Sequence, residues 1–234
     1  GAELTRLDAG EDRVWVSIDE IPVHVRDAFI SAEDNRYYEH PGVDIIRIFG
    51  AAWQDVKAGS YVQGASTITQ QLIKLSHLTS EKTMSRKLEE AVLAYQMEKQ
   101  FDKNQILEMY MNYVYLGRGY YGVEAAALGY FGVHAGELSL AQGATLAGIL
   151  KSSSRYSPHI APEASRGRRN LILSLMCDYG HIDEAARDAA VAEPLTIVAQ
   201  TEQKRGYYIN AALTEAAQLL GCKKADLLAA GYRI

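Results

Sequence analysis

The sequence lacks the features that mark several specialised classes of protein. Only two cysteines occur in 234 residues, and Cys177 and Cys222 do not have the spacing of a metal site. No apolar run reaches the roughly 20 residues of a membrane-spanning helix, and no signal peptide is recognisable. Basic residues are not in excess, because the net charge is -5. We therefore expect no nucleic-acid partner. The two cysteines are expected to be free and buried, and a disulfide bond between them is the alternative.

The composition that remains is typical of one folded globular domain. Hydrophobic residues make up 48% of the chain and charged residues 23%, which is the balance of a folded protein. The length is sufficient for one substantial domain with a buried core. Because the molecule as a whole is acidic, an anionic ligand would have to be held by a local cluster of basic side chains.

Hydrophobic periodicity predicts a chain that is mainly α-helical. Apolar residues recur at the spacing of a helix face over most of the sequence. The alternation of Val14, Val16 and Ile18 indicates a short strand. Helices are predicted at about 22–33, 44–58, 67–76, 85–100, 103–114, 124–131, 140–150, 161–178 and 183–192, with two more between 206 and 230. Three of them have a predicted side-chain cap at their start, namely Asp44, Asp102 and Ser139.

Two adjacent carboxylates, Glu33 and Asp34, end the first of these helices. A helix C-terminus carries partial negative charge, and the preceding helix face is apolar. Both effects favour the protonated form of a carboxyl group and raise its pKa toward the range that is useful for acid–base catalysis. The alternative is an ordinary solvated helix end, and these residues alone leave both interpretations open.

The helix that begins near residue 67 has one polar face. Ser66 is predicted to cap its first turn, and Thr67, Gln70, Gln71 and Lys74 project together from the side opposite its apolar residues. A helix start with hydroxyl and amide groups suits an anion. The alternative is a solvated polar face.

Two other segments also admit two interpretations. Glu90 lies where its helix passes from solvent into the core, and Arg86, four residues earlier, is a candidate partner. The 44–58 helix has apolar residues on more than one face. It is either a core helix or a helix that partly enters a bilayer surface.

Four sequence blocks occur in a set order. They are Glu33-Asp-Asn-Arg-Tyr-Tyr-Glu-His-Pro-Gly42, Gly64-Ala-Ser-Thr-Ile-Thr-Gln-Gln71, Arg86-Lys-Leu-Glu-Glu90 and Lys103-Asn-Gln-Ile-Leu-Glu-Met-Tyr-Met-Asn112. Each block alone is weak, but the ordered set is specific. Over roughly residues 20–180 the chain resembles the peptidoglycan glycosyltransferases (glycosyltransferase family 51). It departs from that pattern at Tyr37, where the family usually has Phe, and at Met111, where it usually has Leu.

The resemblance implies a two-lobed, lysozyme-like helical domain with a cleft between the lobes. We expect residues 1–20 to be an N-terminal strand or linker and residues 21–200 to be the glycosyltransferase domain. Residues 201–234 would be C-terminal helices that lead toward a linker and transpeptidase region. The implied location is the extracytoplasmic face of the bacterial cytoplasmic membrane, with an anchor outside this sequence. The implied partners are the membrane surface, through residues 45–56, and other cell-wall synthesis proteins.

The reaction implied by the resemblance is the polymerisation of lipid II, a disaccharide-pentapeptide on a polyprenyl pyrophosphate. A β-1,4 bond forms with inversion, so the step needs a base for the attacking hydroxyl and stabilisation of the departing anion. Glu33 is predicted as the base. Glu90 is predicted as the second acid, which orders the basic cluster or a bound cation. No cofactor is required, although Mg²⁺ or Mn²⁺ is a candidate for assisting the pyrophosphate. No dedicated metal ligands are recognised.

The resemblance also assigns the residues that bind lipid II and the nascent glycan strand. Lys74, Arg86 and Lys151 are expected to line the same cleft as Glu33 and to converge on one pyrophosphate. Arg155 is a further candidate. The full set of predicted substrate-binding residues is Asp34, Ser66, Thr67, Gln70, Gln71, Lys74, Lys82, Arg86, Lys87, Lys151 and Ser154.

Two alternatives belong to other functional classes. A lysozyme-like, glycan-cleaving enzyme would also use a glutamate in a helical cleft, but it would not need the cations around Lys74 and Arg86. A module that only binds lipid II would keep the cations and could lose Glu33, which is present.

Overall fold

The structure is a computed structural model that describes residues 12–50, 66–77, 84–198 and 214–221. The chain divides into two compact units, residues 13–197 and residues 1–12 with 198–234. Of the second unit, residues 214–220 are helical, in agreement with one of the two predicted C-terminal helices. The rest of that prediction, and residues 51–58 of the second predicted helix, lie outside the described residues.

The larger unit is almost entirely helical, as the periodicity predicted. Its helices are α1 (Val23–Glu33), α3 (Ile68–His77), α4 (Met84–Gln100), α5 (Lys103–Tyr113), α6 (Val123–Phe131), α7 (Leu140–Ile149), α8 (Ser153–Tyr156), α9 (Pro162–Asp178) and α10 (Glu184–Ala192). Residues 45–50 are also helical. Short 3-10 turns cover Ile18–Glu20 and Ala135–Glu137, and β1 (Asp12–Arg13) pairs with β2 (Tyr120–Tyr121).

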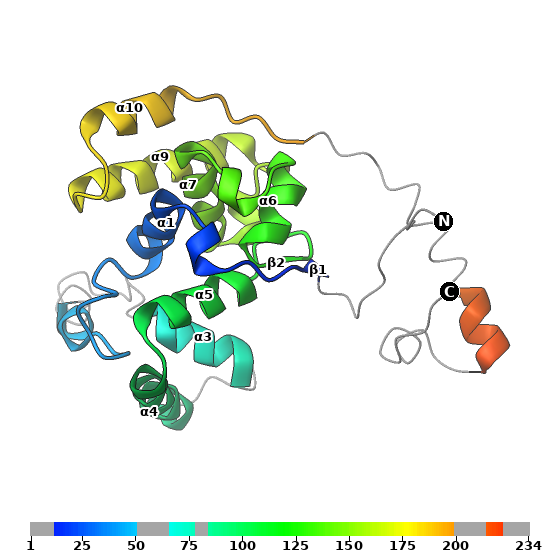
Figure 1. The fold of residues 1–234 in the computed structure, drawn as a ribbon, viewed down its shortest axis with the longest axis horizontal. Coiled ribbons are helices and arrows are strands. Elements are labelled where there is room, and N and C mark those ends of the chain that lie inside the picture. The colour runs from blue at the N-terminus through cyan, green and yellow to red at the C-terminus, as the bar shows by residue number, and fades with distance from the viewer. Residues whose placement is uncertain (1–11, 51–65, 78–83, 199–213, 222–234) are drawn as a thin grey trace. The chain divides into compact units, whose positions relative to one another are not determined.

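The helices of this unit form two groups. Helix α7 packs against α1 and α9, and α10 packs on α9, whereas α3 packs against both α4 and α5 (Figure 1). The first group is held closely because α7 is rich in small residues. A Cβ atom added at Gly143 would lie only 3.0 Å from Val25 Cγ2 of α1, so the two helix backbones are in near contact. Among the described residues, no helix is both long and apolar enough to cross a membrane.

Side-chain caps fix where the helices begin. The predicted caps Asp44, Asp102 and Ser139 are confirmed, since each carboxylate or hydroxyl accepts a backbone amide at the start of its helix. The predicted Ser66 cap is wrong by one residue. Thr67 exchanges hydrogen bonds with Gln70 in the reciprocal pattern of a capping box.

The predicted strand through Val14, Val16 and Ile18 is not formed, because Ile18 opens a 3-10 turn and the paired strand β1 ends at Arg13. The segment is held by α5 instead. Asn112 accepts a hydrogen bond from the Val16 amide and donates one to the Val16 carbonyl, both at 2.8 Å. Side-chain bonds to one fully buried amide thus replace the pairing that a strand would make.

Replacing Asn112 with Ala should therefore destabilise the protein. Two buried backbone groups of Val16 would lose their partners, which costs about 2–5 kcal/mol at typical values for unsatisfied buried groups. Urea unfolding of the variant measures this loss. Asn104 is the matched control, because it lies on the same helix but is exposed, and Asn104→Ala should change stability by less than about 0.5 kcal/mol. Equal stability of the two variants would contradict the assigned role.

Candidate functional site

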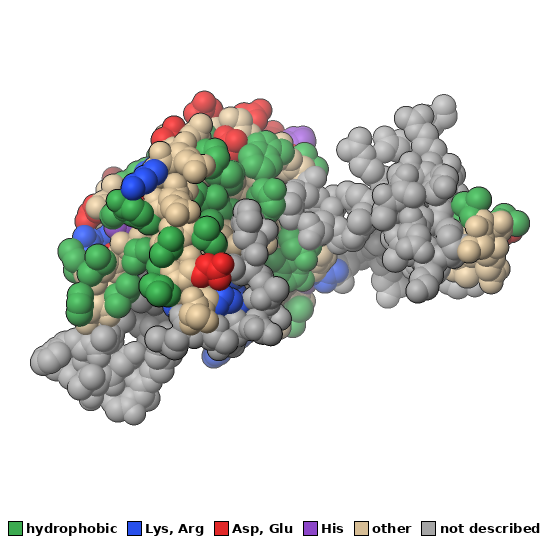
Figure 2. Space-filling view, turned by 90° about the horizontal axis from the view of Figure 1, so that it is seen from below, with side chains coloured by type: hydrophobic (Ala, Val, Ile, Leu, Met, Phe, Trp, Pro, Cys, Tyr) green, Lys and Arg blue, Asp and Glu red, His purple; other side chains and the backbone are tan. Residues whose placement is uncertain are grey.

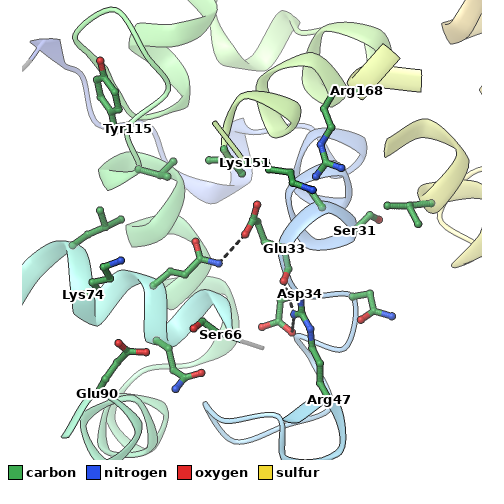
Figure 3. A pocket seen from close by; sticks show the side chains of 18 of the residues that line it. Ser31, Glu33, Asp34, Arg47, Ser66, Lys74, Glu90, Tyr115, Lys151 and Arg168 are labelled. Carbon is green, nitrogen blue, oxygen red and sulfur yellow. Dashed lines mark hydrogen bonds and ion pairs between the residues drawn. The ribbon is translucent and has the colours of Figure 1, made fainter. Parts of the chain in front are cut away.

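A cavity of about 730 Å³ is lined by residues of both helix groups. The end of α1 and helix α3 supply Glu33, Gln71 and Lys74, while Lys151 follows α7 and Arg168 comes from α9 (Figure 3). The predicted residues that line it are Glu33, Asp34, Ser66, Gln70, Gln71, Lys74, Glu90 and Lys151. Residues more than 110 positions apart in the chain therefore meet around one space.

Glu33 faces this cavity from the end of α1. It is the last residue of α1 and is only partly buried, and Gln71 donates a hydrogen bond of 2.8 Å to its Oε2 atom. Burial raises the pKa of the Glu33 carboxyl group above its ordinary value. The Gln71 hydrogen bond and the charges of Arg168 and Arg47 act in the opposite direction. A carboxyl group that combines a raised pKa with a direct hydrogen-bond donor suits proton transfer near neutral pH.

Asp34, the next residue, has a different environment. Its carboxylate is fully buried and accepts the Ile68 amide at 3.0 Å, and His40 Nε2 lies 3.0 Å from both oxygens. Arg47 Nη1 lies 3.8 Å away and also donates to the Glu33 carbonyl. Protein groups thus surround this carboxylate, which links the end of α1 to the start of α3. Its predicted contact with substrate stays a prediction.

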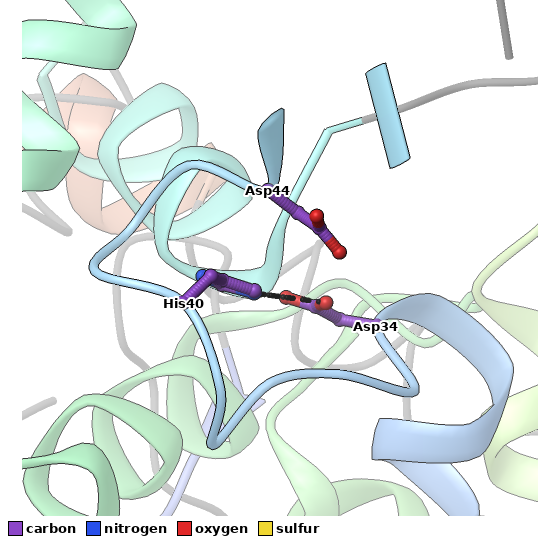
Figure 4. A group of neighbouring side chains, drawn as sticks. All are labelled: Asp34, His40 and Asp44. Atoms are coloured by element: carbon purple, nitrogen blue, oxygen red, sulfur yellow. Dashed lines mark hydrogen bonds and ion pairs between the residues drawn. The ribbon is translucent and has the colours of Figure 1, made fainter. Parts of the chain in front are cut away.

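Asp34, His40 and Asp44 form the group that a metal ion could use among the described residues, with ligand atoms within 4.8 Å of one another (Figure 4). The charge of this group is already balanced. Arg47 neighbours Asp34, and Arg36 Nη1 lies 3.5 Å from Asp44 Oδ1. Two guanidinium groups beside two carboxylates oppose a divalent cation, so the cluster fits a metal poorly and instead anchors the loop.

Glu90 lies at another part of the cavity wall, on α4. It is 3% exposed and forms an ion pair with Lys87, whose ammonium also donates to Ser66 Oγ at 2.7 Å. The sequence indicated that Glu90 needs a partner, and the structure supplies Lys87, one turn earlier. This pair joins α4 to the residues that precede α3.

The basic residues of the cavity lie on two sides of Glu33. Figure 3 shows Lys151 and Arg168 reaching into the same region on one side, and Lys74 and Glu90 on the other. Lys74 and Lys151 are exposed, so their charges meet solvent in the cavity. Lys74 and Lys151 do line one cavity with Glu33, as expected. Their predicted convergence on one pyrophosphate stays a prediction.

Other predicted binding residues lie away from the described cavity wall. Arg86, Lys87 and Ser154 do not line it among the described residues. Thr67 is fully buried and its hydroxyl donates to the Gly42 carbonyl at 2.6 Å. Lys82 lies outside the described residues, as do residues 51–56 of the predicted membrane-contacting segment 45–56.

Sequence reasoning missed Arg168 and Arg47. Arg168 lies next to Arg169 on α9, and the sequence gives no sign that the two differ in role. The structure separates them, since Arg169 is 1% exposed and donates to the carbonyls of Val191 and Glu193 near the end of α10. Only the direction of each side chain distinguishes a cavity cation from a structural one.

Comparison with known proteins identifies the family. A family model described as Transglycosylase matches residues 1–177. Penicillin-binding protein 1A of Aquifex aeolicus is 46% identical over 198 residues, which cover 85% of this chain and 27% of that protein. Penicillin-binding protein 1F of Bacillus subtilis is 40% identical over 229 residues, which cover 96% of this chain and 32% of that protein. The chain thus spans about a third or less of the length of these relatives.

A solved structure shows the same fold. The crystal structure of penicillin-binding protein 1A from Haemophilus influenzae matches 92% of this chain and 23% of its own, with a TM-score of 0.55 and 24% identity. The mainly helical fold predicted from the sequence is therefore confirmed. The family model covers all four sequence blocks and every residue that lines the cavity except Tyr179. The chain therefore belongs to the transglycosylase family, as its resemblance to the peptidoglycan glycosyltransferases predicted.

Proposed function

We propose that this chain is a peptidoglycan glycosyltransferase that polymerises lipid II into β-1,4 glycan strands. The observation that carries the proposal is the placement of one partly buried glutamate, Glu33, between two sets of cations in the wall of a large cavity. Membership of the transglycosylase family supports the same reaction class. Lipid II and the growing strand are the substrates in this proposal.

In this mechanism Glu33 accepts the proton of the attacking 4-hydroxyl group of the acceptor sugar. The oxygen attacks the anomeric carbon of the donor, the bond to pyrophosphate breaks, and the electron pair leaves with the pyrophosphate. Because burial raises the pKa of Glu33, the deprotonated base forms as the pH rises through that raised value. Activity should therefore increase with pH across a range above that of an ordinary solvated glutamate.

The cations stabilise the negative charge of the substrates. Donor and acceptor each carry a pyrophosphate, and cations lie on both sides of Glu33, with Lys74 on one side and Lys151 and Arg168 on the other. Charge-assisted contacts of this kind are strong and orient phosphate groups. A leaving pyrophosphate needs no nucleotide or redox cofactor. Mg²⁺ or Mn²⁺ remains a proposed aid that the phosphate oxygens of the substrate would hold.

Two rival functions predict different products from the same incubation. A glycan-cleaving enzyme would use water in place of the acceptor sugar and would shorten glycan strands. A module that only binds lipid II would leave it unchanged. The family match and the cations that flank Glu33 favour transfer over both, and incubation with lipid II followed by separation of the products by length distinguishes all three.

Glu33→Gln should abolish most of the activity in that assay. The substitution keeps the shape of the side chain and removes the basic site, so polymerisation should fall by about 10²–10⁴-fold, the range of general base catalysis. The matched control is Glu39→Gln. Glu39 is exposed in the loop that follows α1 and pairs with Arg36 there, so its loss should leave the rate unchanged. Near-normal synthesis by the Glu33 variant would show that the base lies elsewhere.

Lys74→Ala and Lys151→Ala should each lower turnover without lowering the stability of the free protein. Loss of a charge-assisted contact to phosphate costs about 1.5–3 kcal/mol, or roughly 10- to 100-fold in rate. Neither exposed ammonium group is held by a hydrogen bond or ion pair among the described residues, so the melting temperature should be retained. Lys99→Ala is the control, because Lys99 lies over the Tyr95 ring on α4. Full activity in both cavity variants would contradict the proposed anion sites.

We also propose that the start of the second predicted helix contacts the membrane at the extracytoplasmic face, where other cell-wall synthesis proteins would be partners. Ile45, Ile46 and Phe49 are 62%, 67% and 71% exposed. Figure 2 shows hydrophobic side chains gathered on the face that it draws. Three large apolar side chains exposed within five residues are typical of a surface that enters the apolar part of a bilayer.

The double variant Ile45→Ser, Phe49→Ser should bind lipid vesicles more weakly. Each apolar side chain contributes about 1.5–3 kcal/mol when fully buried, so partial burial of both predicts a loss of at least tenfold in vesicle affinity. Cosedimentation with vesicles measures it. The control is Ile160→Ser, Leu171→Ser, which removes two other exposed apolar side chains of the same unit. If the first pair unfolds the protein instead, the helix belongs to the core.

A further inference from the structure

Behind the cavity wall that holds Glu33 lies a buried tyrosine that the proposed mechanism does not use. Tyr110 lies on α5, is fully buried, and donates a hydrogen bond of 3.1 Å from its hydroxyl group to Gln71 Oε1. The amide of Gln71 in turn donates to Glu33 Oε2 at 2.8 Å. One chain of hydrogen bonds therefore runs from α5 through α3 to the end of α1.

We infer that Tyr110 is a positioning residue, which acts through Gln71 to hold the Glu33 carboxylate in the orientation and protonation state of a base. This inference rests on the proposed role of Glu33. It concerns a different group, because Tyr110 itself is fully buried and does not line the described cavity.

The direction of the hydrogen bonds is the physical reason. The side-chain amide of glutamine has one oxygen that accepts and one nitrogen that donates, and either end can occupy either place. If the oxygen faced Glu33, two acceptors would lie 2.8 Å apart, which a deprotonated carboxylate does not tolerate. The Tyr110 hydroxyl prevents this reversal because it supplies the donor that the Gln71 oxygen needs.

The Tyr110 hydroxyl group stays protonated, and so able to donate, at every pH at which the enzyme would work. Burial raises the pKa of its hydroxyl group well above the ordinary value, and the nearby charges of Glu33 and Asp34 act in the same direction. A phenol that never ionises near neutral pH is a permanent donor. The orientation of Gln71, and with it the hydrogen bond that favours deprotonated Glu33, is thus set by a group outside the cavity.

Tyr110→Phe tests this inference, because it removes one hydroxyl group and keeps the buried ring. Without a fixed donor, Gln71 can turn its oxygen toward Glu33, which disfavours the charged carboxylate. The acid limb of the pH profile for lipid II polymerisation should move to higher pH by about one unit, so the rate below the limb should fall roughly tenfold, while the rate at high pH is largely kept.

Tyr130→Phe is the matched control. Tyr130 is also fully buried, and its hydroxyl donates to the Leu116 carbonyl at 2.9 Å, away from Glu33. A loss of stability common to both variants would be structural, whereas only Tyr110→Phe should move the acid limb. Titration of the Glu33 carboxyl group by carbon-13 NMR in the free protein gives the same shift without relying on turnover.

Gln71→Ala provides the second arm, including the case in which Tyr110→Phe does not fold. It removes the middle group, so it should move the acid limb in the same direction, and Tyr110→Phe should add no further shift in that background. An unmoved limb in both Tyr110→Phe and Gln71→Ala overturns the inference while leaving the base assignment intact. Full activity of Glu33→Gln overturns both.

Discussion

The buried carboxylate of Asp34 is the interaction on which the arrangement of the candidate site depends. It is fully buried, and it is surrounded by the Ile68 amide, His40 and Arg47. A buried charge is tolerated only when donors and opposite charges are gathered around it. The end of α1, the loop that follows it, the next helix and the start of α3 must therefore come together in one way, and this fixes where Glu33 meets the cavity.

The two acids at the end of α1 show how neighbouring residues acquire different roles. Asp34 points among protein donors, whereas Glu33 faces the cavity with Gln71 as its direct hydrogen-bond donor. Because the helix ends between them, their side chains leave the backbone in different directions. The carboxylate with many partners is structural, and the one with few partners and a raised pKa is free to exchange a proton.

The charges in the cavity wall follow the same division. Glu90 and Lys87 neutralise each other and tie α4 to Ser66. Lys74 and Lys151 instead project from helix ends and faces into the cavity, where solvent reaches them. An acidic protein can therefore present local positive charge, since its acidic residues pair elsewhere or lie on other surfaces.

Much of this protein could be predicted from the sequence alone, because the governing signals are local. Helical periodicity placed most helices, the caps at Asp44, Asp102 and Ser139 followed from side chains next to the backbone that they bind, and the ordered blocks identified the family. The positions that only the tertiary structure decided depend on contacts between distant segments. The sequence does not distinguish Arg168 from Arg169. Glu90 pairs with Lys87. The segment around Val16 forms hydrogen bonds with Asn112, which lies 96 residues away, in place of the predicted strand. Sequence patterns record which residues can form a helix face, but the direction of a side chain is decided by whichever distant group satisfies it at least cost in free energy.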